Sequence, residues 1–507
     1  MGVTGIRIVR VLIFLAVFTA GASFPSAGNG ADLFLSDETE VYAAIDKLNA
    51  LGRLPGLLAN TRPYSVRGLR AAAGSGLRAA SIGGFEKEML WWLAAYVKPN
   101  QMGRVTTAAA FSDVRFVPPN GQGIPVPDGW SGRASVAARE QTTPLVNGQI
   151  RYTWFYGEGG DDGDRLLDAS LEIGSPRFAV QAGKLSTWYG PGRRGALLFT
   201  SNAPPYPAVR IHNPEPVPAP APFSFLGLLG YDLFAARMEK KERFSRSILI
   251  GTRIDARPRA WLEVGFSRAL HYGGKGRSDS ISEFADNYFG NNEASGRSNP
   301  LSGWDITMTL PFAFQPVQAY WERAVEDDSE LGNMFVPWND TGANILGLYF
   351  PRVLGFSRLD LRIEYADTAS GDAADDDWYG HSAYPHRYRG EFLGHPMGGD
   401  SRDWFAESRY HFRPDAFADI SVERVLHGGD PGGERRSVVS AGLTGWLTPS
   451  WRGEARASVN RVTTEGGVPG REGSAFSIWV ALSWQTNTLA PPDEEEVPLR
   501  ELQGVER

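Results

Sequence analysis

Residues 358–365 read RLDLRIEY, and charged and apolar side chains alternate along the whole stretch. Leucine, isoleucine and tyrosine occupy one set of positions, whereas arginine, aspartate and glutamate occupy the other. Because successive side chains of a β-strand point to opposite faces, this stretch predicts a strand with one apolar face and one ionic face.

The same period of two recurs through most of the chain from about Arg104 onwards, for example at residues 167–173, 260–267 and 451–459. Alternation also suits an antiparallel sandwich with one wet face. A membrane barrel is favoured because the polar positions carry charges of both signs, as a polar lumen allows, and because the apolar segments repeatedly carry aromatic residues. The fold class we predict is all-β, a large antiparallel transmembrane β-barrel.

The length of the barrel region limits the number of strands. A spanning strand takes about 9–11 residues, and its connections roughly double that, so residues 101–487 accommodate about 16–20 strands. We expect long connections at residues 214–222, 273–300 and 371–403. The first of these is rich in proline, and we expect it not to pair as a strand.

Two segments outside the barrel have distinctive compositions. Residues 1–27 combine Arg7 and Arg10 with the apolar run VLIFLAVF and small residues, which predicts a secretory signal peptide cleaved after Ala22 or Ala27. Residues 488–507 contain the run PPDEEE, which predicts an acidic disordered tail.

Residues 28–100 predict a small periplasmic helical bundle. Apolar side chains recur at helical spacing in three stretches, residues 41–51, 66–73 and 85–96. Ser36 is a candidate cap for the first helix, whose first turn carries acidic residues that suit the helix dipole.

Composition narrows the possible partners. The chain has no cysteine, so we expect neither a disulfide nor a lipid anchor on a cysteine after the signal peptide. It holds 51 basic and 58 acidic residues, and removal of the signal peptide leaves a net charge of about −9. Nucleic-acid binding is therefore not expected, because it needs a basic excess or patch.

Residues 183–211 are rich in glycine and proline and include WYGPGRR at 188–194. Residues 190–195 match G-x-G-x-x-G, but the prolines that follow exclude the helix that a dinucleotide site needs. We expect a plug or lumen motif whose arginines pair with lumenal carboxylates, with direct sugar contact as the alternative. Its residues are Trp188, Tyr189, Gly190, Pro191, Gly192, Arg193, Arg194, Asn202 and Arg210.

Residues 377–390, DWYGHSAYPHRYRG, form a loop dense in aromatic and planar polar side chains. Aromatic faces stack on sugar rings, and arginine binds carboxylates with two parallel hydrogen bonds. The loop therefore predicts polysaccharide binding, with packing into the barrel as the alternative that does not exclude it. The candidate polysaccharide-binding residues are Trp378, Tyr379, His381, Tyr384, His386, Arg387, Tyr388 and Arg389.

No standard catalytic or metal motif is present. Residues 399–403 fail the last position of G-x-S-x-G, and no H-E-x-x-H occurs. His381, His386 and His395 share a loop with Asp400, but their spacing matches no common metal site. The acidic run at 372–377 lacks the ligand spacing of a calcium loop. We predict no catalytic residues, no metal and no cofactor.

Several of these motifs resemble a known family. WYGPG at 188–192 leading to SNAPP at 201–205 resembles the signature of the Wzi family of outer-membrane capsule-assembly proteins, and residues 262–268, 303–305 and 388–401 are similar to it. The likeness covers most of the chain but departs at residues 214–222 and at the acidic tail.

The resemblance implies a monomeric barrel of about 18 strands, a periplasmic helical bundle and a lumen obstructed by loops. It also implies lectin-like retention of capsular or other surface polysaccharide in the outer membrane, without catalysis. The expected partners are that polysaccharide, outer-membrane lipid and the barrel-assembly machinery. A porin or diffusion channel for small solutes or oligosaccharides is the alternative function, and the ionic lumen is its support in the sequence.

Overall fold

The computed structural model describes residues 32–35, 37–78, 83–98, 101–143, 145–158, 160, 162–239, 245–288, 297–326, 333–335, 342–369, 378–428, 433–464 and 473–486. The expected signal peptide, the cap at Ser36, the acidic run at 372–377 and the acidic tail lie outside the described residues.

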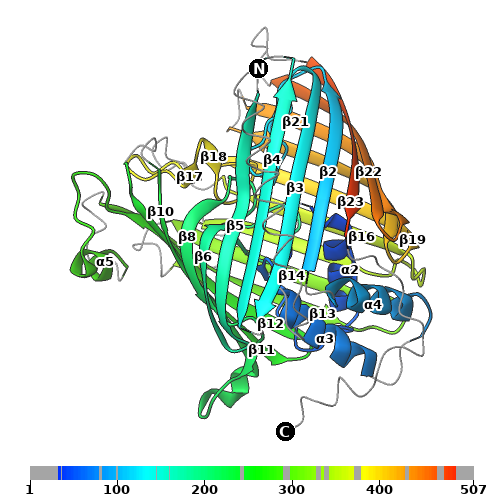
Figure 1. The fold of residues 1–507 in the computed structure, drawn as a ribbon. Coiled ribbons are helices and arrows are strands. Elements are labelled where there is room, and N and C mark those ends of the chain that lie inside the picture. Colours follow the sequence, from blue (N-terminus) through cyan, green and yellow to red (C-terminus); the bar gives the residue numbers. More distant parts are fainter. Residues whose placement is uncertain are drawn as a thin grey trace.

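Within the described residues, eighteen strands close into one antiparallel barrel (Figure 1). The first and last strands meet in register, with Arg104 opposite Gln485, and this pairing closes the ring. The prediction of a large barrel is thus confirmed. The strands are β2 (Gln101–Ser112), β3 (Gly129–Thr143), β4 (Val146–Gly157), β5 (Gly163–Ser175), β6 (Phe178–Leu185), β8 (Tyr206–His212), β10 (Leu228–Arg237), β11 (Ile248–Arg259), β12 (Leu262–Tyr272), β13 (Ser298–Leu310), β14 (Val317–Glu326), β15 (Gly342–Phe350), β16 (Leu359–Asp367), β19 (Ser401–Arg413), β20 (Ala416–His427), β21 (Glu434–Thr448), β22 (Trp451–Thr464) and β23 (Gly473–Gln485).

The alternation in the sequence separates the lumen from the outer surface. On β16, Asp360, Arg362 and Glu364 are buried inside the barrel, whereas Ile363 is 40% exposed on its outside. Outward aromatic side chains pair between neighbouring strands, and the Tyr365 and Trp404 rings lie 4.4 Å apart. The wall is therefore apolar outside and ionic inside, as the stretch RLDLRIEY predicts.

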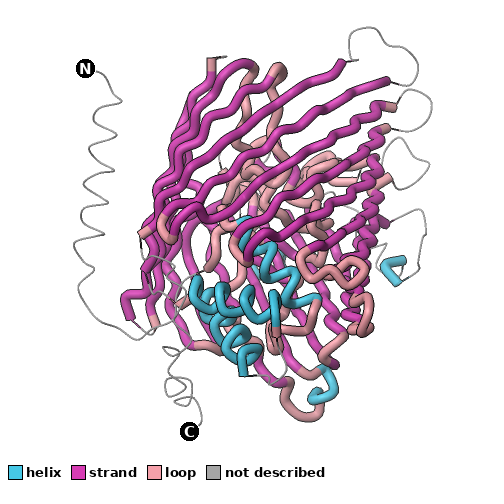
Figure 2. Tube along the Cα trace, turned by 90° about the vertical axis from the view of Figure 1, so that its right-hand side faces the viewer, coloured by secondary structure: helices cyan, strands magenta, loops and turns pink. Residues whose placement is uncertain are grey.

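Three helices lie at one end of the barrel, which we call the helical end (Figures 1 and 2). They are α2 (Thr39–Ala50), α3 (Val66–Arg78) and α4 (Gly84–Val97), and they match the three expected apolar stripes. Trp446 of β21 belongs to their hydrophobic core. Ion pairs join helices to wall, among them Arg452 to Glu40 at 2.8 Å and Arg139 to Glu38 at 2.9 Å.

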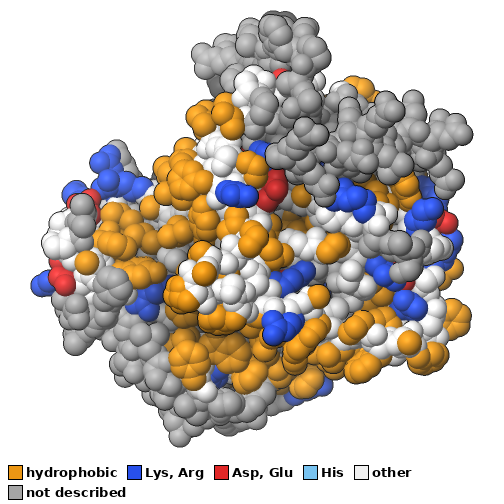
Figure 3. Space-filling model, turned by 90° about the horizontal axis from the view of Figure 1, so that it is seen from below, with side chains coloured by type: hydrophobic (Ala, Val, Ile, Leu, Met, Phe, Trp, Pro, Cys, Tyr) orange, Lys and Arg blue, Asp and Glu red, His pale blue; other side chains and the backbone are white. Residues whose placement is uncertain are grey.

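Short turns join most of the strands at the helical end, and longer connections join most of them at the opposite end, which we call the loop end. The short turns expose several large apolar side chains, and hydrophobic side chains gather on this face in Figure 3. A short helix, α5 (Ile281–Tyr288), lies in the connection between β12 and β13. Among the described residues, no helix has the length and the hydropathy needed to cross a membrane.

The proline-rich segment at 214–222 differs from expectation. Two of its residues form β9 (Val217–Pro218), which pairs with Leu228 and Leu229 of β10, so the prediction that the segment does not pair is wrong at this point. A proline lacks only the N–H donor and keeps its carbonyl acceptor, which permits pairing at the end of a strand. The segment lies at the helical end, where the Ser65 hydroxyl donates to the Pro214 carbonyl over 2.8 Å.

Candidate functional site

Residues 186–205, between β6 and β8, enter the lumen, and we call them the plug segment. Its β7 (Trp188–Tyr189) pairs with β1 (Thr61–Arg62) from the helical region. The Gly190 N–H donates to the Asn60 carbonyl over 2.8 Å. Gly190 has φ +140°, and a Cβ there would collide with the Glu322 carboxylate, so the position requires glycine. The segment is thus fastened to the helical region.

Carboxylates of the barrel wall hold the middle of the plug segment. Glu364 accepts hydrogen bonds from the backbone N–H groups of Arg193 and Arg194, at 2.5 and 2.8 Å. The Arg193 side chain lies 3.7 Å from Glu407, and Arg194 Nε donates to Glu423 over 2.7 Å. Each of these two arginines therefore has an acidic partner in the lumen.

The remaining residues of the predicted motif are also enclosed. Arg210 of β8 lies 3.3 Å from Asp232 and donates to the Ser186 carbonyl over 2.8 Å. The Asn202 amide donates to the Phe392 carbonyl over 3.2 Å. Trp188, Tyr189, Gly190, Pro191 and Gly192 are all buried or half-buried, with the Trp188 indole donating to the Gly190 carbonyl.

Residues 378–400, between β16 and β19, pack onto the plug segment, and we call them the lumenal loop. The Tyr379 hydroxyl donates to the Leu197 carbonyl over 2.5 Å, and His386 Nε2 lies 2.6 Å from the Leu198 carbonyl. Burial lowers the pKa of His386 to about 4, and burial likewise lowers the pKa of His395 to about 3. Both imidazoles are therefore neutral at pH 7.

The candidate sugar-binding residues divide into two groups. Trp378, Tyr379, Tyr384, His386 and Tyr388 are buried, whereas Arg387 and Arg389 are exposed and His381 is half-buried. Stacking on a sugar needs an exposed ring face, which the five buried residues do not offer in this conformation. Of the eight candidates, only Arg387, Arg389 and His381 therefore remain accessible for contact with a glycan.

The two exposed arginines lie in a two-stranded tip, β17 (Arg387–Tyr388) and β18 (Glu391–Phe392). The Arg387 guanidinium lies 4.0 Å from the centre of the Phe392 ring. Arg389 Nε donates to Glu239 over 3.1 Å. Burial raises the pKa of Glu239, but the hydrogen bond and charge of Arg389 outweigh burial and leave that pKa below its usual value.

A family model described as "Capsule assembly protein Wzi" matches residues 98–472. The chain belongs to the Wzi family of capsule assembly proteins. A solved Wzi structure from Escherichia coli, described as an outer-membrane carbohydrate-binding β-barrel involved in group 1 capsule assembly, has a TM-score of 0.69 and 19% identity. That likeness covers 90% of this chain and 99% of the other. Family and fold together indicate an outer-membrane protein.

Two weaker similarities complete the comparison of this Wzi family member with known proteins. A 55.8 kDa protein from the cps region of Klebsiella pneumoniae, described as uncharacterized, is 28% identical over 193 residues. This match spans 35% of the chain and 38% of that protein, well under two thirds of its length. A crystal structure of Pseudomonas aeruginosa OccD3 has a TM-score of 0.46 and 9% identity, over 76% of this chain and 91% of the other.

One feature of this Wzi barrel is absent from the sequence predictions. A cavity of about 510 Å³ lies in the lumen beside the plug segment, bounded by β2 to β4 and β19 to β23. The sequence contains one indication of this cavity, because Arg452 and Arg456 lie on the inward face of β22 and predict a charged lumenal surface there. Alternation cannot show which inward side chains a loop covers, so the cavity itself needs the tertiary structure.

The histidines considered for a metal site take structural positions. His386 and His395 are buried in the lumenal loop, whereas His381 Nδ1 accepts hydrogen bonds from the backbone N–H groups of Ala383 and Tyr384. In the part of the chain that the structure describes, no three His, Asp or Glu side chains group closely enough to hold a metal ion.

Proposed function

We propose that this Wzi family member binds and retains capsular or other surface polysaccharide at the loop end of the barrel, in a lectin-like manner and without catalysis. The observation that carries the proposal is the tip at 387–392, where two exposed arginines project from a loop that is locked into the lumen. Family membership and the carbohydrate binding stated for the Escherichia coli barrel support it.

A fixed tip favours binding because less conformational freedom is lost when the ligand arrives. Buried neighbours hold the tip, since Leu393 donates its backbone N–H to the His386 carbonyl over 3.1 Å and accepts from Thr200 over 2.7 Å. Arg387 and Arg389 then present planar donor groups, which suit the carboxylates of an acidic glycan. Glu239, which pairs with Arg389, is the group that such a carboxylate would replace.

The orientation and the remaining partners belong to the same proposal. The helical end faces the periplasm and the loop end faces the cell exterior, in keeping with the short periplasmic turns and longer outer loops of such barrels. The apolar outer wall contacts outer-membrane lipid, and the barrel-assembly machinery inserts the chain as a monomer.

The test is the double variant Arg387→Ala/Arg389→Ala, compared with a matched control, Arg246→Ala/Lys275→Ala, which removes two exposed basic residues elsewhere at the loop end. Loss of a charge-assisted contact costs about 1.5–3 kcal/mol, which is at least about tenfold in affinity. Cells with the tip variant should release polysaccharide into the medium, whereas control cells keep it. Equal retention at equal barrel levels would contradict the proposal.

A further inference from the structure

The lumenal cavity has the size and the lining of a ligand site. Its volume of about 510 Å³ lies within the roughly 300–1,000 Å³ of typical small-molecule sites. Arg193 and Arg194 of the plug segment form one side, and strand side chains form the others. Its lining reaches Ser112, Phe476 and Asn460, which lie towards the loop-end termini of β2, β23 and β22.

The charged lining is predominantly basic. Among the described residues that line the cavity, seven arginines stand against four acidic residues. The arginines are Arg133, Arg151, Arg193, Arg194, Arg436, Arg452 and Arg456, and the acids are Asp37, Glu407, Glu423 and Glu454. Serine and threonine hydroxyls from β2, β3, β20 and β21 lie between them. Such a surface attracts anions and offers hydrogen bonds to a polar ligand.

Six of the seven arginines have acidic partners in the protein. Their ion pairs are Arg151–Asp37 at 2.6 Å, Arg194–Glu423, Arg452–Glu454 at 2.9 Å, Arg456–Asp419 at 3.0 Å, Arg193–Glu407 at 3.7 Å and Arg436–Glu423 at 3.9 Å. Arg133 makes no hydrogen bond or ion pair with any residue that the structure describes. The carboxylate that attracts Arg133, Asp37, is already paired with Arg151 at 2.6 Å. A partly buried guanidinium without an ion pair of its own is costly, and an anionic ligand would offset that cost.

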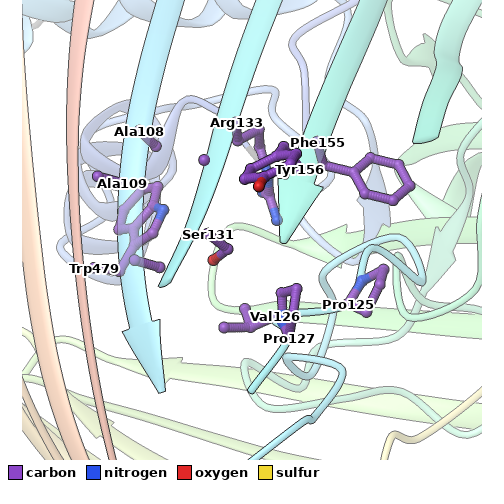
Figure 4. Close-up of a pocket in the computed structure, with 12 residues that line it drawn as sticks. Ala108, Ala109, Pro125, Val126, Pro127, Ser131, Arg133, Phe155, Tyr156 and Trp479 are labelled. Atoms are coloured by element: carbon purple, nitrogen blue, oxygen red, sulfur yellow. The ribbon is translucent and has the colours of Figure 1, made fainter. Parts of the chain in front are cut away.

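An aromatic side chain stands close to this arginine. Trp479 of β23 lies opposite Ala110 of β2, and Arg133 of β3 lies opposite Ala108, the next inward residue along β2. Both side chains line the cavity and a small recess beside it, and in Figure 4 they lie on either side of Ser131. The small side chains of Ala108 and Ala110 lie between them and leave space for a ligand.

Within the described residues, the Trp479 ring contacts no other aromatic ring, and its indole N–H has no hydrogen-bond partner. An accessible aromatic face stacks on the apolar face of a sugar, and a guanidinium binds a carboxylate with two parallel hydrogen bonds. A sugar ring that carries a carboxylate joins both features in one unit, which neither a neutral sugar nor a bare anion does.

We propose that this cavity is a second carbohydrate site, which binds the acidic end of an oligosaccharide that enters from the loop end. Trp479 stacks on the sugar ring, Arg133 binds its carboxylate, and the hydroxyl side chains of the wall bind the sugar hydroxyls. The site goes beyond polysaccharide retention at the tip and does not require Arg387 or Arg389.

The test is calorimetric titration of the purified full-length protein with trigalacturonic acid, with maltotriose as the neutral probe. In the tip variant Arg387→Ala/Arg389→Ala, which lacks the arginines of the first site, we expect one trigalacturonate per barrel and much weaker binding of maltotriose. Arg133→Gln and Trp479→Ala should each weaken trigalacturonate binding at least about tenfold, the size of one charge-assisted contact. Arg133→Lys, which keeps the charge but loses the fork, should fall between wild type and Arg133→Gln.

Arg177→Gln is the matched control, because Arg177 is exposed in the turn between β5 and β6 at the helical end. It should bind as wild type does. Circular dichroism of each variant shows whether the barrel has folded, and a folded Arg133→Lys keeps the test decisive if Arg133→Gln does not fold. The tip variant Arg387→Ala/Arg389→Ala should also retain this binding, so the two proposals fail independently.

Three outcomes would overturn the proposal. The first is the absence of trigalacturonate binding to the wild-type protein at millimolar concentration. The second is equal binding by wild type and a folded Arg133→Gln. The third is competition by inorganic phosphate together with unchanged binding in Trp479→Ala, which would indicate an anion site without sugar recognition.

Discussion

The two halves of the lumen obey the same sequence rule but use their charges differently. Along β14 and β16, inward acids such as Glu322 and Glu364 accept hydrogen bonds from the backbone of the plug segment. Along β20 to β22, the inward acids Asp419 and Glu454 pair with Arg456 and Arg452 of the barrel wall itself, and a cavity remains. An alternating strand therefore supplies a charged surface, and the loops decide whether that surface becomes scaffold or ligand site.

We call the side of the lumen along β14 to β16 the plugged half and the side along β20 to β22 the open half. Removing the plug segment should leave the plugged half open as well. Replacement of residues 191–204 by a short glycine–serine linker should give a steady, large single-channel conductance in planar bilayers, because the segment fills the space beside β14 to β16. We expect little steady conductance in the wild-type protein. Shortening the exposed connection at 275–279 is the control and should leave the conductance at the wild-type level.

The same recording distinguishes the two functions that the sequence leaves open. A wild-type barrel with a steady large conductance would support a diffusion channel and would contradict a binding platform with an obstructed lumen. A variant that stays closed would show that the lumenal loop alone obstructs the pore.

The sequence predicts the strands of the barrel wall better than it predicts the contacts of the loops inside the lumen. The period of two in RLDLRIEY identifies inward and outward faces because each strand is a local pattern. A buried arginine needs a counter-charge, so acidic partners for Arg193 and Arg194 could be expected, but not that they are Glu407 and Glu423. Contacts such as Tyr379 to Leu197 join positions 182 residues apart, and no local pattern encodes them.

The same limit explains why most of the candidate sugar-binding residues are buried in the structure. Aromatic and arginine residues at 377–390 have the composition of a glycan site, but composition does not distinguish a ring that meets a sugar from one that meets the plug segment. Trp479 shows the converse, because it sits in an ordinary alternating strand and its accessible face depends on alanines of a strand distant in sequence.

Substitution of Glu364 tests how much the contacts between the barrel wall and the plug segment contribute to stability. Glu364→Ala leaves the N–H groups of Arg193 and Arg194 without their acceptor and removes the partner of the Tyr320 hydroxyl. Each N–H group left without an acceptor costs about 1–3 kcal/mol, so the free energy of unfolding should fall by about 2–6 kcal/mol. Urea unfolding in lipid vesicles, followed by tryptophan fluorescence, measures it.

The control is Glu215→Ala, which breaks a partly exposed ion pair with Arg67 at the helical end. A surface pair of this kind contributes below about 1 kcal/mol. If both variants lost the same stability, the contrast between a scaffolding acid and a surface acid would be wrong.

A smaller effect is expected when the lumenal loop is loosened by acid. His386 lies against Leu198, Phe199 and Tyr379, and burial lowers its pKa to about 4 from about 6.5. Neutral His386 therefore stabilises the packed loop fully above pH 6.5. This stabilisation is lost as the pH falls towards 4. The loss reaches about 3 kcal/mol at pH 4, because the released loop then binds a proton that the packed loop binds only in part.

Hydrogen exchange of residues 378–400 at pH 7 and pH 4, corrected for the intrinsic rates, measures this opening. In the wild-type protein the loop should lose protection at pH 4 while the barrel strands keep theirs. His386→Gln retains a donor for the Leu198 carbonyl but has no proton to gain, so its loop should lose less protection between the two pH values. A remaining loss in that variant points to His395, whose pKa burial also lowers. An equal loss in the wild-type protein, in His386→Gln and in His386→Gln/His395→Gln would show that carboxylates, rather than the buried imidazoles, set the acid response of the lumenal loop.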